Sequence, residues 1–179
     1  MGRSGGLLFF WKDDWDVTVH SYSRGHIDVT IISEEKIQWR FTGFYGNSQY
    51  SMRKFSWELL RHLKGMFSLP WVCGGDFNEI SSPTEKVEDP ENCVSRMVNF
   101  QCALTDSNLS DLGFVGLVPT WNDRRNGVLN VQERLDCFVC TDAWRLLFPN
   151  ASVHHMDIFV SDHRTLVLFL AEKSRPSQN

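Results

Sequence analysis

The chain has 179 residues, 42% hydrophobic and 13% aromatic, which suffices for one domain of roughly 150 residues that buries about two-thirds of its surface. Eighteen lysines and arginines against 22 aspartates and glutamates give a net charge of -4. This excludes a broadly basic nucleic-acid-binding surface, so any contact with phosphate has to be local. No apolar run reaches the roughly 18 residues of a membrane helix.

Apolar patterns predict the strands. Residues 7–11 are apolar on both faces, which is typical of a strand buried between two layers. Elsewhere apolar and polar residues alternate, or short apolar runs end in glycine, and these patterns predict strands at residues 15–19, 27–31, 37–45, 71–76, 135–140, 153–160 and 166–170. The last of these strands is expected to be buried. His20 and His26 flank a turn, and we interpret them as solvated turn residues rather than ligands.

Helical spacing of apolar residues predicts a helix over residues 51–66 and a second one around Met97, Phe100 and Leu104. The polar segment 81–92, which contains two prolines, is predicted to be a loop, and residues 122–130 to be a hairpin tip. Thr141 is expected to cap a short helix at residues 143–148.

The five cysteines are odd in number and follow no secretory leader, which indicates free thiols and an intracellular protein. Cys137 and Cys140 have the spacing of a redox or zinc pair. Because strand alternation sends the two sulfurs to opposite faces, we interpret both as core residues.

Asp76 and Asn78 follow a short apolar run and the glycines Gly74 and Gly75. The glycines permit close backbone approach at the end of a strand. A carboxylate beside a carboxamide suits a polar reaction centre, because one accepts a proton or binds a cation and the other donates and accepts hydrogen bonds. An Asx-turn in which the two side chains satisfy their own backbone explains the pair equally well.

Asp136 lies among apolar strand residues, so it needs a cationic or hydrogen-bonding partner. His163, at a strand start, needs a carboxylate from another strand to orient its ring, and Asp136 is the natural candidate. Arg134 is the alternative partner for Asp136. Ser161, Asp162 and His163 are adjacent in one extended segment and therefore cannot converge as a hydrolase triad.

Four motifs in this order resemble the endonuclease/exonuclease/phosphatase superfamily, the fold of DNase I: Gly75-Asp76-Phe77-Asn78, Thr120-Trp121, Arg134-Leu135-Asp136 and Ser161-Asp162-His163. Further segments look like the endonuclease domains of plant LINE-type (non-LTR) retrotransposons: Leu69-Pro70-Trp71, Asp111-Leu112-Gly113-Phe114 and Glu133-Arg134-Leu135-Asp136. The resemblance implies an α/β protein (α+β), a four-layer α/β/β/α sandwich of two facing mixed sheets flanked by helices. It implies Mg²⁺-dependent (or Mn²⁺-dependent) phosphodiester hydrolysis that nicks DNA to prime reverse transcription.

The resemblance also implies residue roles. Asp76 would orient or deprotonate the attacking water, with Asn78 holding it, and His163 would hydrogen-bond the scissile phosphoryl oxygen, with Asp136 fixing its ring. Tyr45 would reach the phosphate. Asp162 would bind the metal. The substrate-binding residues would be Thr120, Trp121 and Ser161, with Thr120 donating to a phosphate oxygen and Trp121 packing beneath the site. We expect Asp76, Asn78, Asp136, Asp162 and His163 to converge in one cleft.

The family carries an asparagine and a metal-binding glutamate N-terminal to the segment that resembles residues 4–7. This chain begins at that segment, and its early carboxylates (Asp13, Asp14, Glu34 and Glu35 among them) have no motif to recommend them as replacements. The chain is therefore expected to lack the first strand and helix of the fold, to bind metal weakly and to be an impaired enzyme. Residues 1–171 would form the domain and residues 172–179 a polar tail.

Two other functions remain open. One alternative is a phosphatase of the same superfamily that acts on small phosphoesters or lipid headgroups. The other is a non-catalytic remnant that binds nucleic acid or a partner. The leading expectation is a monomer that binds DNA and no membrane, with a nuclear location left open.

Overall fold

The computed structural model describes residues 6–33, 36–87, 94–127, 130–157 and 161–170. Its main sheet has six strands in the order β1-β2-β3-β4-β9-β6. β3 and β4 run parallel, and every other pair of neighbours is antiparallel. The strands are β1 (Asp16–Tyr22), β2 (His26–Ile32), β3 (Gln38–Tyr45), β4 (Trp71–Asp76), β9 (Asp136–Cys140) and β6 (Ser110–Asp111). The sequence predicted each of the first five.

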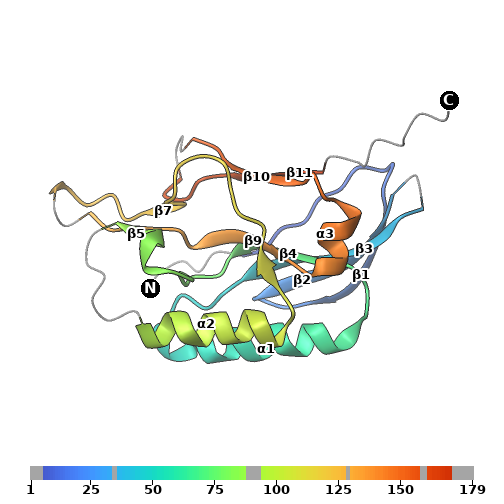
Figure 1. Cartoon of the computed structure of the whole chain (residues 1–179), viewed down its shortest axis with the longest axis horizontal. Helices are drawn as coiled ribbons and strands as arrows, with labels where there is room; N and C mark the ends of the chain where they lie inside the picture. The colour runs from blue at the N-terminus through green and yellow to red at the C-terminus, as the bar shows by residue number, and fades with distance from the viewer. Residues whose placement is uncertain (1–5, 34–35, 88–93, 128–129, 158–160, 171–179) are drawn as a thin grey trace.

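Two helices cover one face of this sheet, α1 (Arg53–Met66) and α2 (Val94–Asp106) (Figure 1). A 3-10 turn, η1 (Tyr50–Met52), precedes α1. Trp57, Leu60 and Leu63 of α1 are buried because their spacing places them on one side of the helix. They share a core with Phe44 of β3 and Phe100 of α2. Both predicted helices are confirmed, and no helix in the described ranges is long and apolar enough to cross a membrane.

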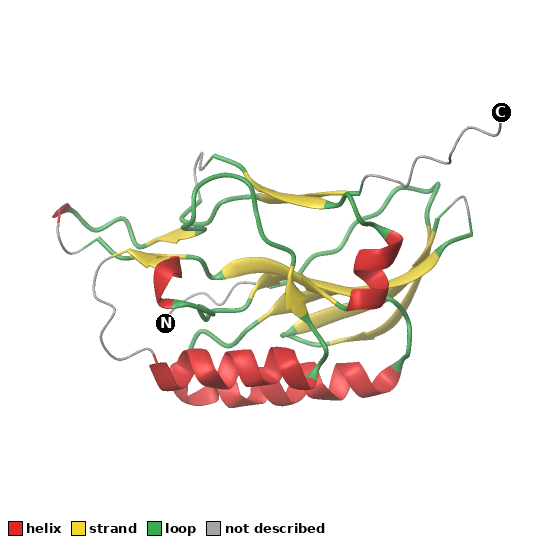
Figure 2. Ribbon diagram, in the orientation of Figure 1, coloured by secondary structure: helices red, strands yellow, loops and turns green. Residues whose placement is uncertain are grey.

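A second β layer lies against the opposite face (Figures 1 and 2). It contains the antiparallel pair β10 (Ser152–His155) and β11 (Leu166–Phe169). A small sheet, ordered β5-β8-β7, continues this layer through a bridge between Trp121 and His163. Its strands are β5 (Lys86–Val87), β8 (Gln132–Glu133) and β7 (Trp121–Asn122), and the 3-10 turn η2 (Pro83–Glu85) precedes β5. The architecture is an α/β sandwich with two β layers, as expected.

The core between the β layers is separate from the core under the helices. Val72 of β4, Cys140 of β9 and Trp144 of α3 (Asp142–Leu147) are buried in it, with Leu168 packed against them. Cys137 is buried on the helical side instead. The two sulfurs therefore point to opposite faces, as predicted. Thr141 caps α3 as predicted, since its side chain accepts a hydrogen bond from Trp144 N.

Residues 7–11 do not form the predicted buried strand. Leu8 is 77% exposed and Phe10 is 79% exposed, while Phe9 stacks on Phe41 of the main sheet at 5.9 Å. The prediction was wrong because a run of apolar residues identifies a strand only when a neighbouring strand pairs with its backbone. In the described part of the chain, this segment instead contacts the face of the main sheet through side chains such as Phe9.

Three smaller expectations also need correction or lie out of reach. His26 is buried, not solvated. The hydroxyls of Ser21 and Ser23 lie 2.9 and 2.8 Å from its ring nitrogens and replace the hydrogen bonds that water would make. β11 was expected to be buried, yet Phe169 is 51% exposed. Predictions on residues 158–160, on Glu34 and Glu35, and on the domain boundary at residue 171 lie outside the described residues.

Candidate active site

Three neighbouring strands bring polar side chains to the same end of the main sheet. β3 ends at Tyr45, β4 ends at Asp76 and β9 begins at Asp136. Tyr45 is in parallel register with Asp76, and Asp76 is in antiparallel register with Asp136. Paired residues project from the same face. Val72, four residues before Asp76, packs between the two β layers, so all three side chains project toward the second layer.

Glycines allow the strand that carries Asp76 to pass close to its neighbours. Gly75 has φ 142°, and a Cβ added there would lie 2.2 Å from the carbonyl oxygen of Phe44. A Cβ added at Gly74 would lie 2.3 Å from the Phe138 ring. Any larger residue would push β3 or β9 away from β4. The close approach expected from the two glycines is therefore present.

Asn78 lies beside Asp76 through a turn rather than through a continued strand. Its backbone is left-handed, with φ 55°, a conformation in which asparagine is several-fold enriched over most residues. Asn78 N donates to Asp76 Oδ1 at 2.8 Å, and Asn78 Nδ2 donates to Asp76 Oδ2 at 2.8 Å and to the Gly46 carbonyl at 3.0 Å. The Asx-turn is therefore present, and it orders both side chains; the functional interpretation of the pair stays a prediction.

Thr120 holds the start of β9. Its Oγ1 accepts hydrogen bonds from Leu135 N at 3.0 Å and from Asp136 N at 2.9 Å, and the residue is 0% exposed. A buried hydroxyl that accepts two backbone N–H groups has no access to a substrate. The expectation that Thr120 donates to a phosphate oxygen is therefore corrected: Thr120 positions Asp136.

His163 contacts Asp136 from the other β layer. Nδ1 of His163 lies 2.9 Å from Oδ2 of Asp136, which fixes the ring orientation that we expected. Since the carboxylate accepts, Nδ1 carries the proton and Nε2 is left for another partner. The backbone of His163 is held in turn by its bridge to Trp121 and by a bond from its N to Ser161 Oγ at 3.1 Å.

Asp76, Asp136 and His163 each place one ligand atom within 4.8 Å of the others. Burial raises the pKa of Asp76 to about 7, and the negative charge of Asp136 adds to this, while hydrogen bonds from Asn78 oppose it. Burial alone would lower the pKa of His163, but the hydrogen bond to Asp136 and the charges of Asp136, Asp76 and Asp162 raise it. A carboxyl group with a pKa near neutrality, next to an imidazole whose pKa is raised, suits proton transfer at physiological pH.

Asp162 and Ser161 lie on the exposed rim of this cluster. The indole Nε1 of Trp121 donates to Asp162 Oδ2 at 3.3 Å, and Ser161 Oγ donates to Asp162 Oδ1 at 3.5 Å. The guanidinium of Arg124 donates to the Ser161 carbonyl. Trp121 is half-buried against Ile80, Met97 and Leu135, so it supports the rim from below while its indole nitrogen holds Asp162.

Tyr45 borders a groove between the loop after β3 and the start of α1. The groove has a volume of about 610 Å³ and is also lined by Arg24, Asn47, Gln49 and Phe55. Tyr45 is half-buried, and its register with Asp76 places it at the edge of the same site. The geometry thus groups Tyr45, Asp76, Asn78, Asp136 and His163 at one sheet end, with Asp162 on the rim.

Arg134 is not the partner of Asp136. Its guanidinium binds Glu85 at 2.6 Å and Asp111 at 2.5 Å, and it lies over the Phe114 ring at 4.6 Å. The sequence analysis missed Glu85, although a signal was present: Ser82 and Glu85 form a capping box around η2. Buried Glu85 also accepts from Ser81 N at 2.6 Å, so this network braces the loop that follows Asn78.

The same cluster could hold a divalent cation. Burial is the main cause of the raised pKa of Asp76, and repulsion by the Asp136 carboxylate adds to it. A hard cation between carboxylate oxygens relieves such repulsion. Asp162 adds a third carboxylate on the rim. His163 Nδ1 is hydrogen-bonded to Asp136 and is therefore not available as a metal ligand. The protein ligands of the cation would be carboxylate oxygens of the aspartates. The donor set therefore fits a hard cation that keeps several waters.

Fold and site geometry together define an α/β sandwich of the DNase I-like class, with carboxylates at the ends of its central strands and a histidine that contacts them from the second β layer. Solved structures share this fold. The endonuclease domain of TRAS1, a telomere-specific non-LTR retrotransposon, matches with a TM-score of 0.70 and 22% identity over 92% of this chain and 72% of that one. An endonuclease/exonuclease/phosphatase family protein from Leptotrichia buccalis C-1013-b matches with a TM-score of 0.54 and 15% identity over 89% of this chain and 61% of that one.

Comparison of sequences adds nothing to this likeness. No protein-family model matches the chain, and no curated protein matches it. At 22% and 15% identity the structural likeness establishes the fold, and the chemistry has to be argued from the site itself.

Proposed function

We propose that this chain is a divalent-metal-dependent phosphodiester hydrolase that nicks DNA, an endonuclease of the retrotransposon type. The observation that carries the proposal is the convergence of Asp76, Asp136 and His163, which span 88 positions of the chain, within 4.8 Å. Asn78 is bonded to Asp76 in the same place. Strand ends far apart in sequence gather such groups where a substrate has access to them.

Each residue has a role that fits its environment. Asp76, whose pKa is raised to about 7, accepts a proton from the attacking water near neutral pH, and Asn78 orients that carboxylate. Asp136 holds Nδ1 of His163, so the ring presents Nε2 to a phosphoryl oxygen. Tyr45 approaches the phosphate from β3. Asp162 and Ser161 line the exposed side, where the substrate enters.

Asp162, with Asp76 and Asp136, would hold Mg²⁺ or Mn²⁺. When bound, the cation supplies Lewis-acid stabilisation of charge on the phosphoryl oxygens, a contribution of several kcal/mol in such sites. Asp136 is already bonded to His163 and Asp76 to Asn78, which leaves few free carboxylate oxygens. We therefore propose weak metal binding, and low activity at limiting metal concentration.

DNA is the proposed substrate rather than a small phosphoester. Two features support this: the plant LINE-like segments of the sequence and the similarity of the fold to the endonuclease domain of TRAS1, a non-LTR retrotransposon. With a net charge of -4, long-range attraction to DNA is absent, so binding has to rest on contacts near the site. We also propose that the protein acts as a monomer.

The test is nicking of supercoiled plasmid by the purified chain, with Mg²⁺, with Mn²⁺ and with chelator. We expect metal-dependent conversion to open circles, abolished by Asp76→Asn. Asp106→Asn, which changes an exposed carboxylate on α2, is the matched control and should nick like the parent. Phosphate release from a phosphomonoester without nicking would favour the phosphatase alternative. Plasmid binding without cleavage at any metal concentration would favour the non-catalytic alternative.

A further inference from the structure

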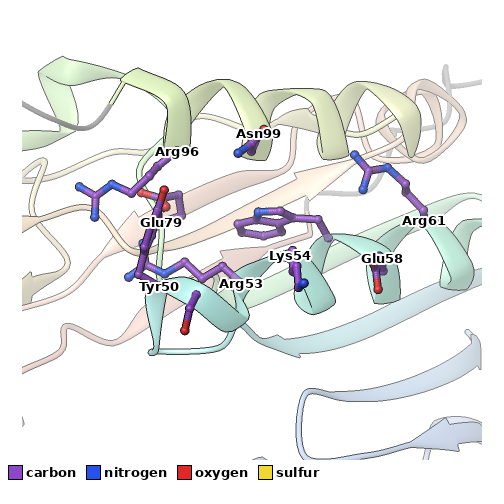
Figure 3. Close-up of a pocket in the computed structure, with 10 residues that line it drawn as sticks. Tyr50, Arg53, Lys54, Glu58, Arg61, Glu79, Arg96 and Asn99 are labelled. Carbon is purple, nitrogen blue, oxygen red and sulfur yellow. The ribbon is translucent and has the colours of Figure 1, made fainter.

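Glu79, the residue that follows Asn78, is a buried carboxylate that forms an ion pair with Arg53. Its side chain is 3% exposed, and Oε2 accepts a hydrogen bond from Arg53 Nη1 at 2.6 Å. Figure 3 shows Arg53 reaching from the first turn of α1 toward Glu79 at one end of a pocket between α1 and α2. A buried carboxylate is costly unless it is paired, so this ion pair restricts where Glu79, and with it Asn78, can lie.

Arg53 also holds the loop that follows β3. Its Nε donates to the Asn47 carbonyl at 3.3 Å, and Asn47 N donates to Ser56 Oγ of α1 at 2.9 Å. One guanidinium thus joins two loops, residues 46–49 and residues 77–80, to the start of α1. Arg53 is able to do this because its planar group presents several donors in fixed directions.

The two loops touch each other directly beside the candidate active site. Gly46 N donates to the Asp76 carbonyl at 2.7 Å, and Asn78 Nδ2 donates to the Gly46 carbonyl at 3.0 Å. A Cβ added at Gly46 would lie 2.1 Å from the Phe77 carbonyl oxygen. Asn78 is in a left-handed conformation, and the contacts of both loops hold its side chain against Asp76 and Gly46.

We propose that Arg53 and Glu79 are positioning residues for the reaction, a buried ion pair that sets the Asn78 carboxamide against Asp76. This proposal rests on the proposed function. Neither residue touches the substrate; they act through the loop between Asp76 and Glu79. Removal of either charge leaves Asn78 free to turn away from Asp76 and Gly46.

The kinetic test compares this ion pair with a second one made by the same helix. Arg61 Nε of α1 lies 2.8 Å from Asp106 Oδ2 of α2, and both side chains are exposed. We expect Glu79→Gln to lower kcat for plasmid nicking about 10- to 100-fold with KM within twofold. Arg53→Lys, which keeps the charge but loses the fork, should lower kcat less than Arg53→Ala. Arg61→Ala and Asp106→Asn should stay within twofold of the parent.

A second readout follows the Asn78 side-chain amide directly by NMR in ¹⁵N-labelled protein. Its protons are bonded in the parent, so we expect slow exchange with solvent there, at least tenfold faster exchange in Glu79→Gln and in Arg53→Ala, and no change in Arg61→Ala. This measurement needs no activity, so it tests the ion pair even if the chain does not nick DNA. If Arg53→Ala fails to fold, Glu79→Gln and Arg53→Lys decide the matter.

Three outcomes would overturn the proposal. One is an Asn78 amide that exchanges equally slowly in parent and Glu79→Gln. Another is faster exchange of that amide with kcat unchanged, which removes the role in the reaction. The third is a raised KM at constant kcat, which would make the pair part of substrate binding. Failure of the proposed function is a different result: no nicking by the parent, with the amide still sensitive to Glu79→Gln.

Discussion

Nδ1 of His163 lies 2.9 Å from Oδ2 of Asp136, although the two residues belong to different β layers and are 27 positions apart. Asp136 is itself held by the Thr120 hydroxyl through its backbone N–H. The imidazole thus has one orientation, with Nε2 available at the site. Four experiments follow from this arrangement and its surroundings.

Loss of the His163 imidazole should lower the nicking rate more than loss of the Asp136 carboxylate. We expect His163→Asn to lower single-turnover nicking by about 10²–10³-fold, because a donor to the phosphoryl oxygen is lost. Asp136→Asn, which leaves the ring in place but less firmly oriented, should cost about 10–100-fold. If Asp136→Asn were as active as the parent, the contact between Asp136 and His163 would be structural only.

Asp76→Asn should abolish nicking and yet stabilise the protein at pH 8. Burial raises the pKa of Asp76 to about 7 in the folded state, above its unfolded value of about 3.9. The stability contribution of this carboxyl is therefore fully present below pH 4 and is lost as pH rises through 7. Thermal unfolding in chelator should show a gain on the order of 1–2 kcal/mol at pH 8.

The stabilisation by Asp76→Asn should vanish at pH 4, where the parent carboxyl is protonated as well. Asp106→Asn, at an exposed ion pair, provides the comparison and should change stability by roughly 0–1 kcal/mol at pH 8. A parent that is less stable at pH 5 than at pH 8 because of Asp76 would contradict the raised pKa.

Thr120→Val should destabilise the fold through the backbone at the start of β9. The substitution keeps the shape but leaves Leu135 N and Asp136 N without their acceptor, and each buried donor left unpaired costs about 1–3 kcal/mol. Urea unfolding measures the loss. Thr165→Val, at an exposed position, is the control, with an expected change within about 0.5 kcal/mol. Equal midpoints for the two variants would be inconsistent with the buried acceptor role.

Arg134→Met should be among the most destabilising single changes in the chain. It leaves Glu85 and Asp111 without the guanidinium that binds both, and breaking a buried ion pair on one side costs about 3–5 kcal/mol. Arg134→Lys should recover only part of this loss, because an ammonium group cannot bind two carboxylates as a fork does. Thermal unfolding of the three proteins gives the order, and a Lys variant as stable as the parent would refute the fork geometry.

Several parts of this structure follow from sequence pattern alone. The spacing of Leu59, Leu60, Leu63 and Met66 predicts α1 because helical period depends only on neighbouring residues. The alternation around Cys137 and Cys140 predicts opposite faces for the same reason. The apolar run at residues 7–11 shows where this reasoning fails, since a strand requires a partner that pattern does not supply.

In the candidate site, too, some features follow from the sequence and others only from the tertiary structure. The sequence by itself determined which residue types lie at or next to the strand ends: the carboxylates Asp76 and Asp136, the amide Asn78 and the imidazole His163. Only the tertiary structure decided that Asp136 pairs with His163 and not with Arg134, that Thr120 faces inward, and that Glu79 is bound by Arg53. Those choices depend on contacts between segments that sheet register and layer packing bring together, and burial then decides which charged groups need partners.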